Sequence, residues 1–208
     1  MDRETAKKLT AAERARVLAE TRAEAQTCQR CDLWRTRRQV VFGEGYPDAA
    51  IMLMGEGPGD TEDREGHPFV GRAGKLLDRT LAAAGLARER LWVTNLVRSR
   101  PCSLVNGVLR NRAPRAGEVA ACRIWRDAEL NLVLPRLVVC LGAVPASYLI
   151  HKDFKINAER GQLFAVDDVR YLATFHPAYI LRLTGAAYDR VLALFEADLR
   201  LAAEAAGQ

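Results

Sequence analysis

Residues 54–74 read MGEGPGDTEDREGHPFVGRAG, and they follow a short apolar run at positions 49–54. An apolar run of this length that ends at glycine is typical of a strand buried on both faces of a sheet. A second glycine pair, Gly71 and Gly74, opens an apolar pattern of helical period that we expect to extend over 72–84. The stretch therefore predicts a buried strand, a glycine-rich loop and a helix in succession.

The glycine-rich loop is suited to holding a ligand against the backbone. Glycines leave main-chain N–H groups uncovered, so a planar or anionic group can approach closely. A nucleotide cradle is one interpretation, but the spacing matches neither standard phosphate-binding pattern, and carboxylates that would repel phosphate crowd the loop. These carboxylates are Glu56, Asp60, Glu62, Asp63 and Glu65. They suit the polarisation of a water or of a developing cation, and a plain tight turn between strand and helix is the remaining interpretation.

The composition indicates one domain spanning residues 1–208, with 49% hydrophobic and 27% charged residues, as in ordinary soluble proteins. No apolar run approaches the ~20 residues of a membrane span, and the charged N-terminus lacks the apolar core of a signal peptide. We therefore expect a cytoplasmic protein, and we take it to be a monomer. In that compartment the five cysteines are expected to be metal ligands or buried thiols, because disulfides are rare there.

Positive charge is concentrated in one segment of the chain. The net charge of +5 is by itself a weak indication of a polyanionic partner. Between positions 98 and 117, however, there are five arginines and no acidic residue. A solvated arginine-rich loop and a nucleic-acid contact both explain this segment; for the second we assign Arg100, Arg110 and Arg112 to DNA binding.

Strand and helix patterns alternate along the chain, which predicts an α/β sandwich with a mainly parallel sheet. A capping box at Thr10 and Glu13 begins the first helix. We expect helices at 10–26, 72–84, 118–132, 144–150 and 186–205, and strands at 49–54, 91–97, 136–141, 161–166 and 170–175, with a further short strand at 39–42.

Parallel sheets bind ligands at the carboxyl ends of their strands. Three segments lie there in the predicted topology: the glycine-rich loop, the loop that begins at Asn95, and the His176-Pro177 pair. We expect them to bring together Glu56, Glu62, Phe69, Asn95 and His176. A ring, an amide, an imidazole and carboxylates form a suitable set for binding a nucleobase.

The cysteines suggest a metal site. Cys28 and Cys31 have C-x-x-C spacing, and Cys102 and Cys122 could complete a set of four. Four thiolates suit Zn²⁺ and a [4Fe–4S] cluster equally well, and unliganded thiols are the alternative. Such a site would link the end of the first helix to the helix at 118–132. Cys140 lies in the middle of a predicted strand, where a buried thiol packs as a small hydrophobe.

Taken together, several motifs resemble those of family 4 uracil-DNA glycosylases, the iron–sulfur branch of the uracil-DNA glycosylase superfamily. The resemblance covers about residues 28–199. It rests on Gly55-Glu-Gly-Pro-Gly59, Glu62-Asp63, the run from Gly66 to Gly74, Thr94-Asn95, Asn111-Arg-Ala-Pro114, Leu141-Gly142 and His176-Pro-Ala-Tyr179. It implies a three-layer α/β/α sandwich, a [4Fe–4S] cluster, and excision of uracil from single- or double-stranded DNA to leave an abasic site.

The resemblance also implies roles for the residues of the glycine-rich loop. Gly55, Glu56 and Gly57 match the motif that faces the uracil and its sugar. Glu62 matches the carboxylate proposed to activate water. The residues alone do not rank Glu56 against Glu62 as the group that orients the water.

Outside that loop, Phe69 matches the aromatic residue that stacks on the flipped base, and Asn95 the residue that reads the pyrimidine edge. His176 matches the residue near uracil O2. Leu181 and Arg182 match a segment that is inserted into the DNA minor groove.

The sequence departs from the family pattern at one expected metal ligand. The family has a cysteine four residues after the asparagine, where this chain has Ser99, and the nearest thiol is Cys102. We expect Cys102 to replace it and to complete a set with Cys28, Cys31 and Cys122. The following loop is longer than usual. Two other classes remain open: a non-catalytic, metal-linked DNA-binding module, and a nucleotide-binding enzyme that uses the loop at 55–59.

Overall fold

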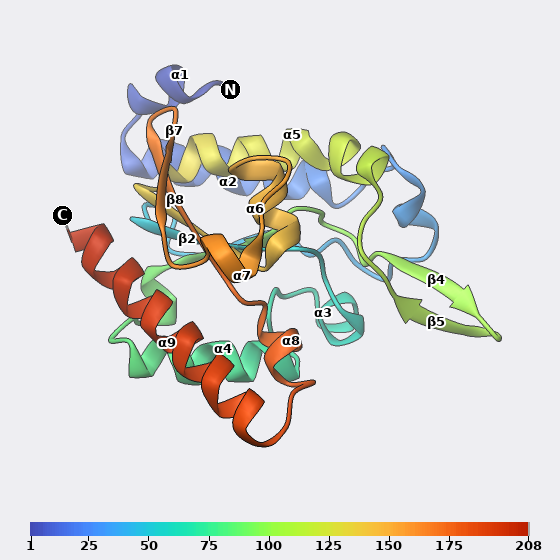
Figure 1. Cartoon of the computed structure of the whole chain (residues 1–208). Helices are drawn as coiled ribbons and strands as arrows, with labels where there is room; N and C mark the ends of the chain where they lie inside the picture. Colours follow the sequence, from blue (N-terminus) through green and yellow to red (C-terminus); the bar gives the residue numbers. More distant parts are fainter. Residues whose placement is uncertain (208) are drawn as a thin grey trace.

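Six strands of the computed structural model, which describes residues 1–207, form one sheet (Figure 1). They are β1 (Glu44–Gly45), β2 (Ile51–Gly55), β3 (Trp92–Asn95), β6 (Leu137–Leu141), β7 (Leu163–Val166) and β8 (Val169–Thr174). Their order is β1-β3-β2-β6-β8-β7. The four central strands are parallel, and the two edge strands run antiparallel to their neighbours. The predicted α/β fold with a mainly parallel sheet is confirmed.

Helices cover both faces of the sheet, which confirms the three layers. They are α1 (Arg3–Lys7), α2 (Ala11–Ala25), α3 (Asp60–Glu65), α4 (Arg72–Ala83), α5 (Ala116–Val133), α6 (Ala143–Leu149), α7 (Ile156–Glu159), α8 (Pro177–Ile180) and α9 (Gly185–Gly207), with short 3₁₀ helices at Asp32–Arg35 and Arg88–Arg90. One hydrophobic core joins the sheet to α2, α5 and α6, and a second joins it to α4 and α9 (Figure 1). Within residues 1–207, no helix is both long and apolar enough to cross a membrane.

The side chains of β2 show why its sequence is an unbroken apolar run. Met52 and Met54 pack into the core that includes α2, α5 and α6, whereas Ile51 and Leu53 pack into the core that includes α4 and α9. Successive side chains of a strand point to opposite faces. A central strand covered by helices on both faces therefore needs apolar residues at every position.

The capping box predicted for the first long helix is present. Thr10 is the N-cap of α2, its side chain accepts from the Glu13 amide, and the Glu13 carboxylate accepts from the Thr10 amide.

The prediction of a strand at 39–42 is wrong. Residues 40–42 are buried by packing, and the Val41 amide donates to the Arg98 carbonyl at 2.8 Å, but the sheet edge is formed by β1.

The arginine-rich segment after β3 contains a hairpin that the sequence analysis missed. Strands β4 (Cys102–Val105) and β5 (Val108–Asn111) pair antiparallel and project from the body of the molecule (Figure 1). Asn106 and Gly107 form the turn, both with positive φ (50° and 75°). An Asn-Gly pair between apolar residues is the strongest short-range hairpin signal, so the sequence contained the information needed to predict it.

Candidate active site

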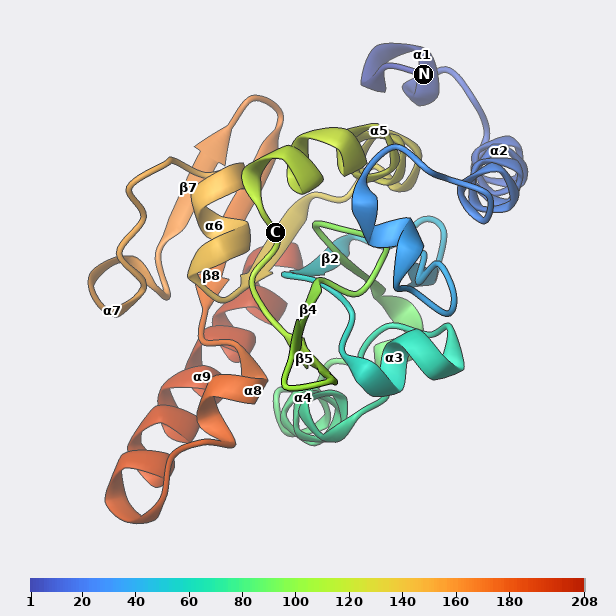
Figure 2. The ribbon, with the colours of Figure 1, turned by 90° about the vertical axis from the view of Figure 1, so that its right-hand side faces the viewer.

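A cavity of about 600 Å³ opens where the parallel strands β2 and β3 end. Figure 2 shows α3, α8 and the β4–β5 hairpin on this same side of the molecule. The residues that line the cavity include Glu56, Gly57, Glu62, Phe69, Asn95, Arg112, His176 and Arg182. The structure thus brings together the five side chains that the sequence analysis expected to meet, with Arg72, Arg112 and Arg182 at the same cavity.

Gly55 does not line the cavity but lies behind two residues that do. A Cβ atom at this position would be 2.4 Å from Asn95 Oδ1 and 2.5 Å from the Phe69 ring. Such separations are far below van der Waals contact, so only glycine allows this close approach. Gly55 therefore acts by letting the Phe69 ring and the Asn95 amide come together.

Phe69 is held in an unusual backbone conformation. Its φ is 54°, which is rare for a bulky residue and marks local strain that the surrounding structure must enforce. A Cβ atom at Gly74 would be 1.7 Å from the Phe69 carbonyl oxygen, so the start of α4 packs directly on this turn. The Phe69 ring lies 5.9 Å from the His176 ring, centroid to centroid, with 32° between their planes. An aromatic surface and an imidazole are thereby fixed next to each other at the cavity.

Asn95 presents an amide at the cavity with its hydrogen-bonding capacity unused. The residue ends β3, is 2% exposed, and its Oδ1 has no hydrogen-bond partner among residues 1–207. A buried polar atom without a partner costs about 1–3 kcal/mol. That cost indicates that a ligand group completes the hydrogen bonding of the amide.

His176 is a neutral hydrogen-bond donor at neutral pH. It caps α8, and the Ala178 amide donates to its Nδ1 at 3.0 Å, which leaves the ring proton on Nε2. Burial, with a smaller contribution from the charge of Arg182, lowers the pKa of His176 from 6.5 to about 4. The imidazole therefore offers an uncharged Nε2–H group.

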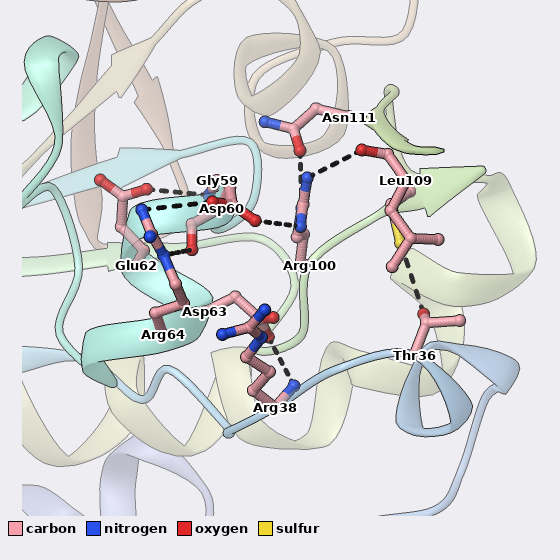
Figure 3. Close-up of polar contacts among 11 residues, drawn as sticks. Thr36, Arg38, Gly59, Asp60, Glu62, Asp63, Arg64, Arg100, Leu109 and Asn111 are labelled. Atoms are coloured by element: carbon pink, nitrogen blue, oxygen red, sulfur yellow. Dashed lines mark hydrogen bonds and ion pairs between the residues drawn. The ribbon is translucent and has the colours of Figure 1, made fainter. Parts of the chain in front are cut away.

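The two carboxylates predicted to be catalytic have different surroundings. The Glu62 carboxylate accepts from three main-chain amides: Gly59 at 3.1 Å, Val70 at 3.1 Å and Gly71 at 2.8 Å. It therefore joins the N-terminus of α3 to the turn before α4. The sequence analysis had left α3 within a loop. Figure 3 shows the hydrogen bond between the Glu62 carboxylate and Gly59. Most of its acceptor capacity is used within the protein.

Glu56, by contrast, makes no hydrogen bond or ion pair with the described part of the chain. Its carboxyl is half-buried at the cavity, and burial raises its pKa above the ordinary 4.5, although the charge of Arg182 opposes this shift. Desolvation without a compensating partner leaves both carboxylate oxygens available to a water molecule or a substrate.

The arginines predicted to bind DNA fall into two groups. Arg100 is buried, and it donates to Asp60 at 2.6 Å and to Asn111 Oδ1 at 2.7 Å, so it anchors the hairpin to α3 (Figure 3). Arg112 pairs with Glu118 through both terminal nitrogens. Arg110, on β5, is exposed and makes no ion pair within residues 1–207.

The loop after α8 supplies the other predicted contacts. Arg182 is exposed at the cavity, and Leu181 is half-buried against the core that includes α9. Of the five predicted DNA-binding residues, Arg110 and Arg182 are therefore the exposed ones. Asn111, whose own side chain had no predicted role, also lines the cavity because the hairpin returns the chain there.

Three of the four predicted metal ligands lie at one small cavity. It is lined by Cys28, Cys31 and Cys122 but not by Cys102. The Cys28 Sγ accepts from Trp125 Nε1 at 3.2 Å, and the Cys122 Sγ accepts from a main-chain amide at 3.3 Å. Within residues 1–207, no three Cys, His, Asp or Glu side chains are close enough to hold a metal ion as they stand.

Cys140 has the role that the sequence predicted. It is fully buried in the middle of β6, and burial raises the pKa of its thiol well above the usual range. A thiol that remains protonated in an apolar core is a packing residue.

Comparison with known proteins gives a consistent picture. Residues 42–200 match the Uracil DNA glycosylase superfamily. The type-4 uracil-DNA glycosylase of Sulfurisphaera tokodaii is 36% identical over 173 residues, which cover 79% of this chain and 76% of that protein. The type-4 uracil-DNA glycosylase of Thermotoga maritima is 39% identical over 157 residues, which cover 74% of this chain and 78% of that protein. The one of Saccharolobus solfataricus is 39% identical over 167 residues, which cover 76% of this chain and 74% of that protein.

Proposed function

The chain belongs to the uracil-DNA glycosylase superfamily, and we propose that it is a DNA-repair enzyme that flips uracil out of DNA and hydrolyses its N-glycosidic bond. The observation that carries this proposal is the convergence of Phe69, Asn95 and His176 at one cavity. A ring, an unpaired amide and a neutral imidazole suit an uncharged pyrimidine, whereas the acids of the loop disfavour a phosphate. The product is an abasic site.

Base flipping comes first, because the glycosidic bond cannot be reached inside a duplex. Extrusion costs a few kcal/mol, least for mispaired or single-stranded uracil. Stacking on Phe69 offsets about 1–3 kcal/mol of that cost. Because its strained backbone holds the ring in place before binding, little further ordering is required.

Bond cleavage builds negative charge on the departing uracil and positive charge on the sugar. His176 Nε2–H donates to uracil O2, where the negative charge develops. A neutral donor placed there before the reaction acts as in an oxyanion hole. The carboxylates at the cavity stabilise the sugar cation, and the geometry favours Glu56 as the group that orients the attacking water, since Glu62 already accepts three main-chain hydrogen bonds.

Asn95→Ala is expected to lower uracil excision by roughly 10- to 100-fold, which corresponds to the about 1–3 kcal/mol of a buried polar pairing. Its amide accepts from uracil N3–H and donates to O4, a pattern that cytosine reverses. The check is single-turnover excision from matched U·G and C·G oligonucleotides. The protein should fold normally, because the side chain makes no hydrogen bond among the described residues. An unchanged uracil rate would remove Asn95 from base recognition.

We propose that the β4–β5 hairpin and the loop after α8 contact the DNA on either side of the flipped nucleotide. Arg110 and Arg182 are exposed on these two elements, and the hairpin tip also exposes apolar side chains, with Leu104 71% exposed. Exposed aliphatic side chains next to arginines suit a wedge that inserts between base steps of DNA.

Arg110→Ala and Arg182→Ala are each expected to weaken DNA binding and to reduce the salt dependence of log Kd by about one unit, because each removes about one phosphate contact. Titrations of a uracil-free oligonucleotide at several salt concentrations measure this. Arg16→Ala, an equal charge change on the exposed side of α2, is the control and should leave the slope unchanged. A slope that falls equally in all three variants would show a general charge effect and not a defined interface.

One assay separates the proposed function from its alternatives. Single-stranded U, U·G and U·A oligonucleotides are incubated with the protein, and abasic sites are then cleaved and resolved on a gel. A glycosylase yields cleaved strand and free uracil. A non-catalytic DNA-binding module would bind with salt-dependent affinity and release no uracil, and a nucleotide-binding enzyme would be stabilised thermally by ATP or NAD.

A [4Fe–4S] cluster at the second cavity is our proposal for the cofactor. The three thiols of Cys28, Cys31 and Cys122 fit such a cluster in chemistry, and the N–H groups that already donate to two of the sulfurs are typical outer-shell partners. A four-thiol set does not fit, because Cys102 is not at this cavity. The cluster would link the segment after α2 to α5, and no step of the reaction above involves it.

A further inference from the structure

We infer that Ser99, and not Cys102, occupies the fourth ligand position of this metal site; the inference rests on the cofactor proposed above. Ser99 lines the same small cavity as Cys28, Cys31 and Cys122, and it is 6% exposed. The cavity therefore brings together three thiols and one hydroxyl.

The surroundings of Ser99 match those of the cysteines at the cavity. Arg37 Nη1 donates to Ser99 Oγ at 3.3 Å, as a tryptophan nitrogen and a main-chain amide donate to two of the sulfurs. Groups that donate to ligand atoms orient them and stabilise their negative charge. Ser99 thus receives the same kind of hydrogen bond as the thiols of Cys28 and Cys122.

Positive charge at this cavity favours an anionic ligand set. Arg30 and Arg37 line it. Arg98 also lines it, but its guanidinium is already paired with the buried Glu129 at 3.0 Å. If Ser99 held iron, its hydroxyl proton would pass to solvent, and the alkoxide would accept from the Arg37 guanidinium, which already donates to Ser99 Oγ at 3.3 Å. Arg30 and Arg37 would offset part of the charge of three thiolates and one alkoxide, which an apolar cavity would not.

Cys102 is held away from this cavity by the hairpin. It pairs with Asn111 in the β4–β5 ladder, and its Sγ lies 3.4 Å from Thr36 Oγ1. Bringing its sulfur to the other three would require the first residue pair of the hairpin to open. Ser99 needs no such rearrangement.

An oxygen ligand would make one iron atom of the cluster different from the other three. Sulfur is the softer ligand and the better match to iron in such clusters. The iron bound by Ser99 is therefore the one that a chelator reaches first. A cysteine at position 99 would remove this difference.

The test uses the full-length protein purified without oxygen, as wild type, Ser99→Ala, Ser99→Cys and Cys102→Ala. Iron and labile sulfide per chain, visible absorbance, and the rate of iron loss to a chelator are measured. Changes of outer-shell partners typically alter metal affinity about 10–100-fold, so loss of a direct ligand should alter it at least as much. We expect Ser99→Ala to lose iron at least about tenfold faster than wild type, Ser99→Cys to lose it more slowly, and Cys102→Ala to behave as wild type.

A second pair of variants tests the role of the guanidinium. Arg37→Ala should also accelerate iron loss, whereas Arg38→Ala, whose main chain alone makes a hydrogen bond, should not. If Ser99→Ala does not fold, the Ser99→Cys and Arg37→Ala comparisons still decide the matter.

Three results would overturn the inference: bleaching of Cys102→Ala with an unaffected Ser99→Ala, equal rates of iron loss in wild type and both Ser99 variants, or a colourless wild-type protein. Uracil excision is measured on the same samples. Absence of excision from protein with an intact cluster would contradict the proposed function and leave the ligand assignment standing.

Discussion

His176→Ala is expected to lower the single-turnover rate of uracil excision by roughly 10²- to 10³-fold, the cost of removing one donor from an oxyanion-hole type of site. The Ala178 amide fixes Nδ1 as the acceptor, so Nε2–H is the donor that we propose stabilises the departing uracil. Alanine removes this donor and leaves the cavity otherwise intact. Rapid-quench measurement on a U·G duplex gives the rate without the contribution of product release.

A matched variant separates this effect from a change in stability. His151→Ala removes an exposed imidazole that bonds only Glu159, and it should leave the rate unchanged. His176→Ala also removes the cap of α8, which costs about 1 kcal/mol of folding stability. A melting curve for each variant shows whether the protein is still folded at the assay temperature. An excision rate within a few-fold of wild type would exclude His176 from the reaction.

The pH dependence follows from the low pKa of His176. Because its pKa is about 4, the imidazole is neutral across the ordinary assay range, so the defect in His176→Ala should have the same size from about pH 5 to pH 8. In the unfolded chain the pKa is 6.5, so the unfolded state binds the proton first. The stability contributed by the neutral ring is thus complete above about pH 6.5 and is lost as the pH falls towards 4.

The position of the site could be predicted because it follows from topology. Once the apolar run before Gly55 is identified as a central parallel strand, the carboxyl-end rule places the loop after it and Asn95 at the same edge. His176 follows by the same rule, because it lies two residues after the end of β8, another parallel strand. These inferences need only the order of strands and the direction of the chain.

Contacts between distant main-chain groups could not be predicted in this way. The three amides that bind Glu62 come from two turns whose conformations depend on tertiary packing, and the sequence therefore left Glu56 and Glu62 unranked. The exclusion of Cys102 from the metal site depends on the hairpin, whose Asn106-Gly107 signal was present in the sequence but was overlooked within the arginine-rich segment.

Glu56→Gln is expected to lower the excision rate by roughly 10²- to 10⁴-fold, the range for loss of a positioned acid–base group. The isosteric amide fits the same space but carries no charge to stabilise the sugar cation. Single-turnover kinetics on single-stranded uracil DNA measure the effect without the duplex-opening step. Folding should be unaffected, because Glu56 makes no hydrogen bond within residues 1–207.

The pH–rate profile identifies the carboxylate more sharply than the rate at one pH. In the proposed mechanism the charged form of Glu56 is the active one, and burial raises its pKa above 4.5, so the rate should fall as the pH drops through that raised value. This fall in rate at low pH, the acid limb of the profile, should be absent in Glu56→Gln.

Glu62→Gln provides the comparison, because the two carboxylates have different roles in the structure. The Glu62 carboxylate accepts three main-chain hydrogen bonds, and the glutamine amide would place an N–H group against a main-chain N–H group. The melting temperature should therefore drop, and the free energy of unfolding should fall by about 2 kcal/mol or more. The acid limb of the profile should persist in the protein that remains folded. If Glu62→Gln abolished that limb at an unchanged melting temperature while Glu56→Gln kept it, the roles of the two carboxylates would have to be exchanged.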